Sequence, residues 1–123
     1  MRTSILFVVS ALALGACGGD DGAEHSGVST SKQLKDLSAD ERMQECEWGV
    51  SYQGGAGHVT MCSDNVTVTV DTVPECVDAM DQYAASGCTA TVAELEACTR
   101  AIAADPCSFG GDACGPVFAC LGQ

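Results

Sequence analysis

Residues 72–107 read TVPECVDAMDQYAASGCTATVAELEACTRAIAADPC and contain two helix signals in succession. Each signal is a capping box, in which a threonine is followed three residues later by a glutamate: Thr72 with Glu75, and Thr91 with Glu94. In such a box the hydroxyl and the carboxylate accept hydrogen bonds from backbone N–H groups that the first helical turn leaves unpaired. The stretch therefore predicts two consecutive helices.

The apolar spacing within this stretch supports both helices, because apolar residues recur every three or four positions, as on one helical face. They are Val73, Val77, Met80 and Ala84 in the first helix, and Val92, Leu95, Cys98 and Ile102 in the second. Gly87 is expected to end the first helix, and Asp105-Pro106 the second. Glu96 and Arg100 are four residues apart and are expected to form an ion pair on the outer side of the second helix.

Two further helices are predicted on either side of this stretch. Ser38 and Glu41 form a third capping box, which begins a helix that runs to about Val50. A short helix is expected at the C-terminal end, from Asp112 to Leu121. Trp48, the sole tryptophan, lies near the end of the helix that begins at Ser38. We expect it to anchor the core, with a role in a partner-binding patch as the alternative.

The only strand signal lies between the helix that begins at Ser38 and the helix that begins at Thr72. Residues 57–62 and 66–70 alternate apolar and polar side chains, and residues 63–65 provide the turn of a hairpin. An isolated hairpin is unstable in water, so its Val and Met face is expected to pack on the helices. The sequence thus predicts a small, mainly helical domain with three to four short helices and one β-hairpin.

Cysteine is the most informative residue type, with nine copies in the chain. Eight of them are expected to form four disulfides. They are Cys46, Cys62, Cys76, Cys88, Cys98, Cys107, Cys114 and Cys120. A domain this small and poor in aromatic residues buries too little apolar surface to be stable alone, and each disulfide adds about 2–4 kcal/mol. Zinc is the alternative, but even the closest pair is separated by five residues, more than the usual two to four.

One disulfide is predicted from helix geometry. The helices that begin at Thr72 and Thr91 have a short connection, so we expect them to pack antiparallel. Cys76 lies in the first turn of one helix, and Cys107 lies just past the end of the other. Antiparallel packing would place these two ends side by side, within the separation of about 4.4–6.8 Å between α-carbons that a disulfide requires. We therefore predict a Cys76–Cys107 bridge.

The ninth cysteine, Cys17, follows a segment with the layout of a secretory signal. Residues 1–16 carry Arg2, then an apolar run, then small residues. The run is shorter than the roughly 20 apolar residues that cross a bilayer. Leu14-Gly15-Ala16-Cys17 resembles the lipobox of bacterial lipoproteins. The resemblance implies that the Cys17 thiol is acylated and that the signal peptide is cut just before it. An ordinary secretory cut after Ala13 is the alternative.

This resemblance implies a location and a domain layout. An acylated Cys17 would attach the protein to the extracytoplasmic side of a bacterial membrane, within the cell envelope. Gly18, rather than Asp, follows the cysteine, which favours the outer membrane. Residues 17–33 are then the lipidated cysteine and a flexible tether rich in glycine, serine and acidic residues, with His25 solvated inside it. Residues 34–123 form the disulfide-stabilised domain.

The net charge limits the classes of partner. The whole chain has a formal net charge of −12, and removal of the signal peptide removes Arg2 but no acidic residue. Nucleic acid and anionic lipid headgroups both require basic patches, so we expect neither as a partner. The charge is expected to keep the domain soluble, with a specific cationic partner as the alternative.

The sequence contains no recognised catalytic motif, such as G-x-S-x-G, H-E-x-x-H or a phosphate-binding loop. We therefore expect no enzyme, no cofactor and no metal. The layout resembles small cysteine-rich lipoproteins of unknown function, which implies a non-enzymatic binding or structural module with an envelope protein as partner. One alternative is an inhibitor of an extracellular hydrolase that presents the loop Cys107–Cys114, CSFGGDAC. Another is a small hydrolase centred on His58 beside Ser51 or Ser63.

Overall fold

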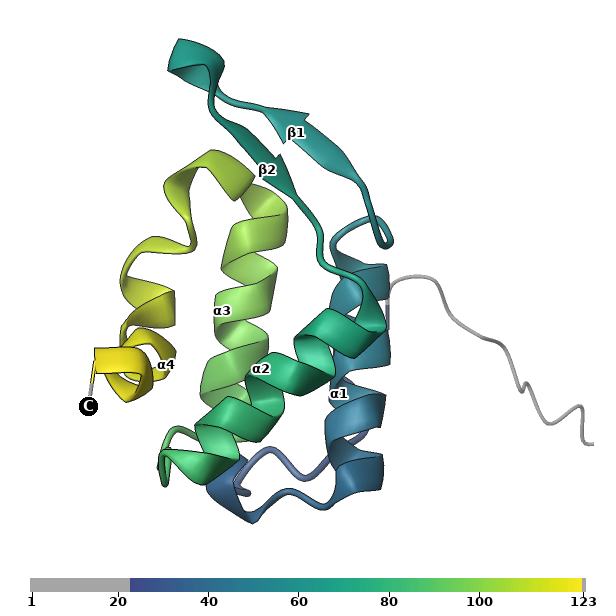
Figure 1. The fold of residues 1–123 in the computed structure, drawn as a ribbon, viewed down its shortest axis with the longest axis vertical. Helices are drawn as coiled ribbons and strands as arrows, with labels where there is room; N and C mark the ends of the chain where they lie inside the picture. The colour runs from purple at the N-terminus through teal and green to yellow at the C-terminus, as the bar shows by residue number, and fades with distance from the viewer. Residues whose placement is uncertain (1–22, 123) are drawn as a thin grey trace, which may run out of the picture.

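The computed structural model describes residues 23–122, so the proposed signal peptide, Cys17 and residues 18–22 lie outside the described part. It has the predicted fold class, a mainly helical domain with one hairpin and four disulfides (Figure 1). Its helices and strands are α1 (Ala39–Tyr52), β1 (Val59–Met61), β2 (Thr67–Thr69), α2 (Val73–Ala85), α3 (Val92–Ala104) and α4 (Gly115–Phe118). Turns of 3-10 helix are η1 (Leu34–Asp36), η2 (Ser63–Asn65), η3 (Pro106–Ser108), η4 (Gly111–Cys114) and η5 (Ala119–Gly122).

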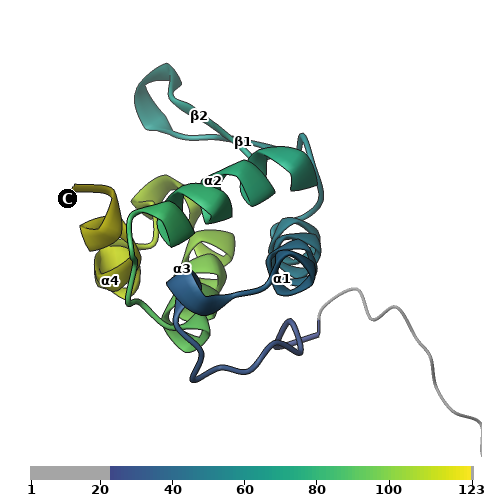
Figure 2. The same cartoon turned by 60° about the horizontal axis from the view of Figure 1, so that its bottom comes forward.

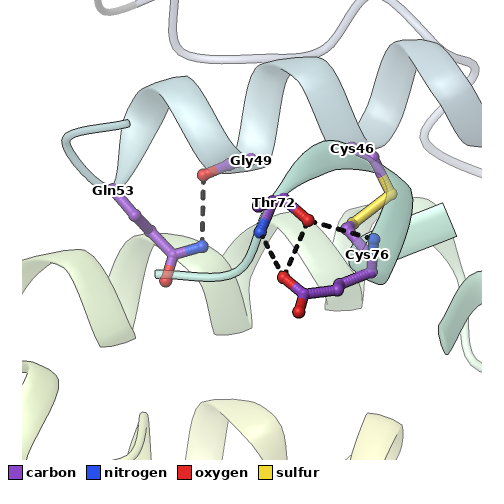
Figure 3. Close-up of a disulfide and its surroundings, with 6 residues drawn as sticks. Cys46, Gly49, Gln53, Thr72 and Cys76 are labelled. Atoms are coloured by element: carbon purple, nitrogen blue, oxygen red, sulfur yellow. Dashed lines mark hydrogen bonds between the residues drawn. A yellow bond between two sulfur atoms is a disulfide. The ribbon is translucent and has the colours of Figure 1, made fainter. Parts of the chain in front are cut away.

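All three predicted capping boxes are formed. The hydroxyls of Ser38, Thr72 and Thr91 each accept a hydrogen bond from the backbone N–H three residues later, and the glutamate there accepts one in return. Figure 3 shows the box at Thr72. Because these bonds satisfy the first turn, α1, α2 and α3 begin where the sequence predicts.

The three long helices are not arranged side by side. α1 and α3 contact each other, and α2 crosses over them and packs on α1 and η1 (Figures 1 and 2). The turns after α3 cover its remaining side. Buried side chains from the predicted apolar stripes meet in the centre, among them Met80, Val92 and Cys98. Leu34 and Val117 complete the core from the two ends of the domain.

All eight cysteines of the domain are paired, as predicted. The four disulfides are Cys46–Cys76, Cys62–Cys107, Cys88–Cys120 and Cys98–Cys114. The predicted Cys76–Cys107 bridge is wrong, because α2 crosses onto α1 instead of lying along α3. This crossing places the first turn of α2 against the middle of α1, where Cys76 and Cys46 have α-carbons 5.7 Å apart (Figure 3). Cys107 instead meets Cys62 at the end of the hairpin.

The hairpin forms, but the packing of its apolar face was predicted wrongly for β1. The paired residues are Val59 with Thr69, Thr60 with Val68, and Met61 with Thr67. This register places the apolar side chains of β1 and β2 on opposite faces, because directly paired residues share a face. Val68 is half-buried, whereas Val59 and Met61 are 51% and 70% exposed. Only β2 therefore contributes apolar side chains to the helix-facing side of the hairpin.

The predicted tether is wrong for residues 23–33, which pack on the helices; we call this segment the N-terminal strap. Val28 is buried in the core, and Gln33 forms an isolated antiparallel bridge with Thr91. Backbone hydrogen bonds from Val92 to Lys32 and from Leu34 to Ala90 extend this pairing, at 2.9 and 2.8 Å. The folded domain therefore includes residues before the predicted start at 34.

The predicted C-terminal helix over residues 112–121 is divided into η4, α4 and η5. Pro116 explains the boundary between η4 and α4, because proline has no N–H to donate and its ring clashes with the preceding helical turn. It is accepted only in the first turn of a new helix, which is where it lies in α4.

Candidate functional site

An apolar cavity of about 290 Å³ lies between α1, α2, α3 and β2. Its walls include the side chains of Val50, Met80 and Ile102. Phe109 and Phe118, which are 54% and 47% exposed, also line it and so mark its rim. The volume is just below the range of about 300–1,000 Å³ that is typical of small-molecule sites.

The cavity lining carries negative charge and no positive charge. Its two charged residues are Glu45 from α1 and Asp71 from the start of the α2 region, and both are acidic. Glu45 is 3% exposed, and neither of its carboxyl oxygens has a hydrogen-bond partner among the described residues. Burial raises the pKa of Glu45 to about 7; the Ser26 side chain and Arg100 oppose this rise, and the neighbouring Glu96 adds to it.

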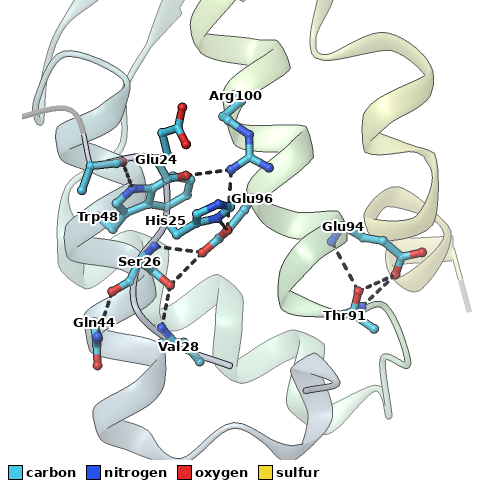
Figure 4. A network of polar contacts seen from close by, with 11 residues as sticks. Glu24, His25, Ser26, Val28, Gln44, Trp48, Thr91, Glu94, Glu96 and Arg100 are labelled. Atoms are coloured by element: carbon cyan, nitrogen blue, oxygen red, sulfur yellow. Dashed lines mark hydrogen bonds and ion pairs between the residues drawn. The ribbon is translucent and has the colours of Figure 1, made fainter. Parts of the chain in front are cut away.

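Glu96 is also fully buried, but its carboxylate is fully engaged (Figure 4). It accepts hydrogen bonds from the backbone N–H and the hydroxyl of Ser26, both at 2.9 Å, and the His25 Nδ1 atom lies 2.6 Å from it. Arg100 lies 3.5 Å away. Burial alone would raise the pKa of Glu96, but the hydrogen bonds from His25 and Ser26 outweigh it and hold the pKa below its usual range.

These contacts correct two predictions. The Glu96–Arg100 pair exists, but it lies beneath the strap and not on the outer side of α3. His25 is exposed to solvent, as expected, but it is also a hydrogen-bond partner of a buried carboxylate and is not free in a tether. The same strap receives hydrogen bonds from the Gln44 side chain to the Ser26 carbonyl and from Arg100 to the Glu24 carbonyl, at 2.8 and 2.9 Å.

Trp48 belongs to this strap interface and is not the core anchor that the sequence suggested. It is half-buried and lies outside the core cluster. Its indole N–H donates to the Ala23 carbonyl at 2.6 Å, and its ring lies 5.2 Å from that of Tyr52. Sequence reasoning noted the residue but missed its contact, because the contact depends on how the strap returns over α1.

The residues considered for catalysis are not assembled into a catalytic group. His58 is exposed and lines a second cavity of about 250 Å³, and within residues 23–122 no hydrogen bond joins it to Ser51 or Ser63. In the same residues no three His, Cys, Asp or Glu side chains are grouped as metal ligands.

The Cys107–Cys114 segment, considered as a bait loop, is not closed by its own cysteines, which pair with Cys62 and Cys98. It folds into η3 and η4. Phe109 between them has a φ of 52°, in the left-handed region that side chains other than glycine seldom adopt.

Comparison of the chain with protein-family models, with curated proteins and with solved structures finds no match. No helix in the described part of the chain combines the length and the apolar character that a membrane crossing requires. The candidate site therefore rests on geometry: an apolar cavity whose wall includes residue 45 and whose rim carries two exposed phenylalanines, Phe109 and Phe118.

Proposed function

We propose that the protein is a non-enzymatic binding module of the bacterial cell envelope, attached to a membrane through an acylated Cys17. The observation that carries this proposal is the complete pairing of the eight cysteines from Cys46 to Cys120. Disulfides persist in oxidising compartments outside the cytoplasm. With those eight paired among themselves, Cys17 has no cysteine left in its own chain, which agrees with a thiol used for acylation.

The binding role is supported by the cavity between the helices. Cavities with mostly apolar walls and a few polar groups are the usual form of small-molecule sites. Exposed aromatic side chains at the rim, Phe109 and Phe118, are the residue type most enriched at binding surfaces. An anchored domain with such a cavity is suited to holding a ligand at the membrane surface.

The test of anchoring is the intact mass of the protein in the membrane fraction. We expect the loss of residues 1–16 and the addition of acyl chains at Cys17. A Cys17→Ala variant should lose both the cleavage and the membrane attachment, while its four disulfides still form. An unlipidated product cut after Ala13 and found in the soluble fraction would contradict the proposal.

A second candidate function is inhibition of an extracellular hydrolase, which Phe109 favours. Its ring is exposed, and its segment is bound to the rest of the domain by the disulfides of Cys107 and Cys114. Rigid exposed segments lose little conformational freedom on binding. Assays of a panel of secreted hydrolases with the wild-type protein and with Phe109→Ala would test it, since only the wild-type protein should inhibit.

A further inference from the structure

We propose that one face of the β-hairpin docks on the surface of the lipid bilayer to which Cys17 attaches the chain. We call it the outer face; it consists of Val59, Met61, Thr67 and Thr69, which are paired across the hairpin and therefore share a face. The inference rests on the proposed anchoring, because the anchor is what brings the hairpin to a membrane.

The outer face exposes apolar side chains that the domain does not cover. Val59 is 51% exposed, and Met61, at 70%, is the most exposed large apolar residue in the described part of the chain. Val66, next to the turn of the same hairpin, is 46% exposed. The hairpin projects beyond the helices (Figure 1). Exposed apolar residues that are grouped in this way, and not scattered singly, mark an interaction surface.

The outer face is also uncharged, in a chain that has 17 acidic and five basic residues. Its four residues are valine, methionine and two threonines, so none of them would carry an ion out of water on contact with lipid. The net charge of −12 repels anionic headgroups. The surface that fits this face is therefore a zwitterionic lipid, with the apolar side chains at the boundary between headgroups and acyl chains.

The strap begins at the same end of the domain as the hairpin. Ala23 is held by the Trp48 indole, and Trp48 lies one turn before Tyr52, the last residue of α1. The chain then turns directly towards β1, and a hydrogen bond of 2.9 Å from the Gly55 N–H to the Val50 carbonyl fastens this turn to α1 (Figure 1). A lipid attached ahead of Ala23 therefore lies nearest to the end that carries the hairpin.

The length of chain before the strap limits how far this end can move from the bilayer. Six peptide steps join Cys17 to Ala23, and they can span at most about 21 Å. A link this short gives a local concentration on the order of mM. A face too small to hold a membrane from solution can dock under these conditions.

An aromatic pair at this end supports the same orientation. The rings of Trp48 and Tyr52 lie 5.2 Å apart, and both residues are half-buried. Tryptophan and tyrosine are enriched where proteins meet lipid headgroups, because each has an apolar body and a polar tip. The pair and the outer face together present interfacial residue types on the side of the domain where the anchor enters.

The test attaches the lipid chemically. It uses the oxidised chain from residue 17 onward, which contains the whole described domain. Because the other eight cysteines are paired with each other, a maleimide lipid in phosphatidylcholine nanodiscs reacts at Cys17 alone. Methionine methyl groups are labelled for NMR, and the phosphatidylcholine carries a spin label high in its acyl chain.

The three methionines of this chain give the readout and its controls. Met61 lies on the outer face, Met43 is 43% exposed on α1, and Met80 is buried. We expect the spin label to broaden the Met61 signal at least about threefold more than the Met43 signal, because only Met61 reaches the acyl boundary. Met80 should broaden least.

The decisive variant combines Val59→Thr with Met61→Gln, which removes apolar surface from the outer face. Met43→Gln, an exposed methionine on α1, is its matched control. Trp48 is the sole tryptophan, so quenching of its fluorescence by the spin-labelled lipid reports on the anchored end of the domain. We expect this quenching to fall at least about twofold in the double variant and to stay unchanged in Met43→Gln.

Equal broadening of Met61 and Met43, or full quenching of Trp48 in the double variant, would overturn the proposal. Shifts at Met61 that grow with protein concentration, without broadening by lipid, would also overturn it, because they would assign the outer face to a second copy of the chain. These outcomes leave the anchoring proposal standing, since the lipid is attached chemically. Conversely, a protein without acyl chains in the membrane fraction would refute the anchoring and not these measurements.

Discussion

Replacing Glu45 with Gln should stabilise the protein above pH 7 and leave its stability near pH 5 almost unchanged. Burial raises the pKa of this carboxyl from 4.5 to about 7 in the folded protein. Between these two values the folded state holds a proton that the unfolded state has lost. The free energy of unfolding therefore falls as the pH rises through this window, and the loss is complete above the folded pKa.

The magnitude follows from the size of that rise. At 1.36 kcal/mol per pKa unit, the change from 4.5 to about 7 corresponds to a loss of about 3 kcal/mol between pH 5 and pH 8. This is a large part of the total stability of a small domain. Glutamine is neutral at every pH and has nearly the shape of the protonated carboxyl, so the variant should not suffer this loss.

Glu96 contributes with the opposite sign and at lower pH. Its pKa is held below the usual value by the hydrogen bonds from His25 and Ser26, despite burial. Its stabilising effect is complete above the ordinary pKa of an unfolded glutamate and is lost as the pH falls through the lowered folded pKa. Because the Glu45 contribution is lost as the pH rises above 4.5 and the Glu96 contribution is lost as the pH falls below it, the wild-type protein should be most stable near pH 5.

Denaturant unfolding of the wild-type protein, Glu45→Gln and the control Glu47→Gln, an exposed position on the same helix, at pH 5, 6, 7 and 8 would measure these effects. We expect the free energy of unfolding to fall with pH in the wild-type protein and in Glu47→Gln, and to fall much less in Glu45→Gln. The reasoning is refuted if the wild-type curve is flat over this range, or if Glu45→Gln has the same slope as the wild-type protein.

Three further predictions concern the backbone and the disulfides. Gly110→Ala should lower the free energy of unfolding by more than about 2 kcal/mol, because φ is +79° there and the new methyl carbon would overlap the Cys114 sulfur. Gly111→Ala, at φ +53° with open space around it, is the control for thermal melts and should cost less. Removing the Cys62–Cys107 bridge with two alanines should speed hydrogen exchange in the hairpin while the helical circular dichroism is kept, since that bridge joins the hairpin to η3. Complete reduction should abolish cooperative thermal unfolding; a reduced protein that still melts cooperatively would show that the core is sufficient alone.

Local signals in the sequence predicted the helices well. A capping box involves residues three apart, so the starts at Ser38, Thr72 and Thr91 needed no knowledge of tertiary structure. The apolar stripes were equally local, and Met80 and Val92 are buried as expected. The expectation of four disulfides followed from number and spread alone.

Features that depend on residues distant in the chain were missed. The Cys76–Cys107 pairing failed because a short connection limits the direction of α2 but not the angle at which it crosses its neighbours. The turn residues of the hairpin did not predict its register, in which Met61 pairs with Thr67 and is exposed. Each of these choices is decided by packing against partners far away in the sequence, which no local pattern records.

The two buried glutamates of the site were missed for a related reason. Glu96 is four residues after Val92 and three before Thr99, so it shares a buried stripe with them. Glu45 similarly precedes Gly49 by four residues on α1. This spacing was the available signal, but a charged residue is almost never fully buried without a partner. The partners of Glu96 lie in the strap, some 70 residues earlier in the chain.

With Cys17 acylated as proposed, the attachment of the strap at Ala23 limits how far the domain can lie from the bilayer. Six peptide steps separate these residues, and they can span at most about 21 Å when fully extended. Because the Trp48 indole N–H donates a hydrogen bond to the Ala23 carbonyl, the segment between Cys17 and the domain ends at α1 and not at the first core residue. A domain anchored in this way would stay within a thin layer above the lipid headgroups. It could contact ligands that partition into the membrane or proteins in the same membrane, but the segment is too short for it to reach an opposing surface.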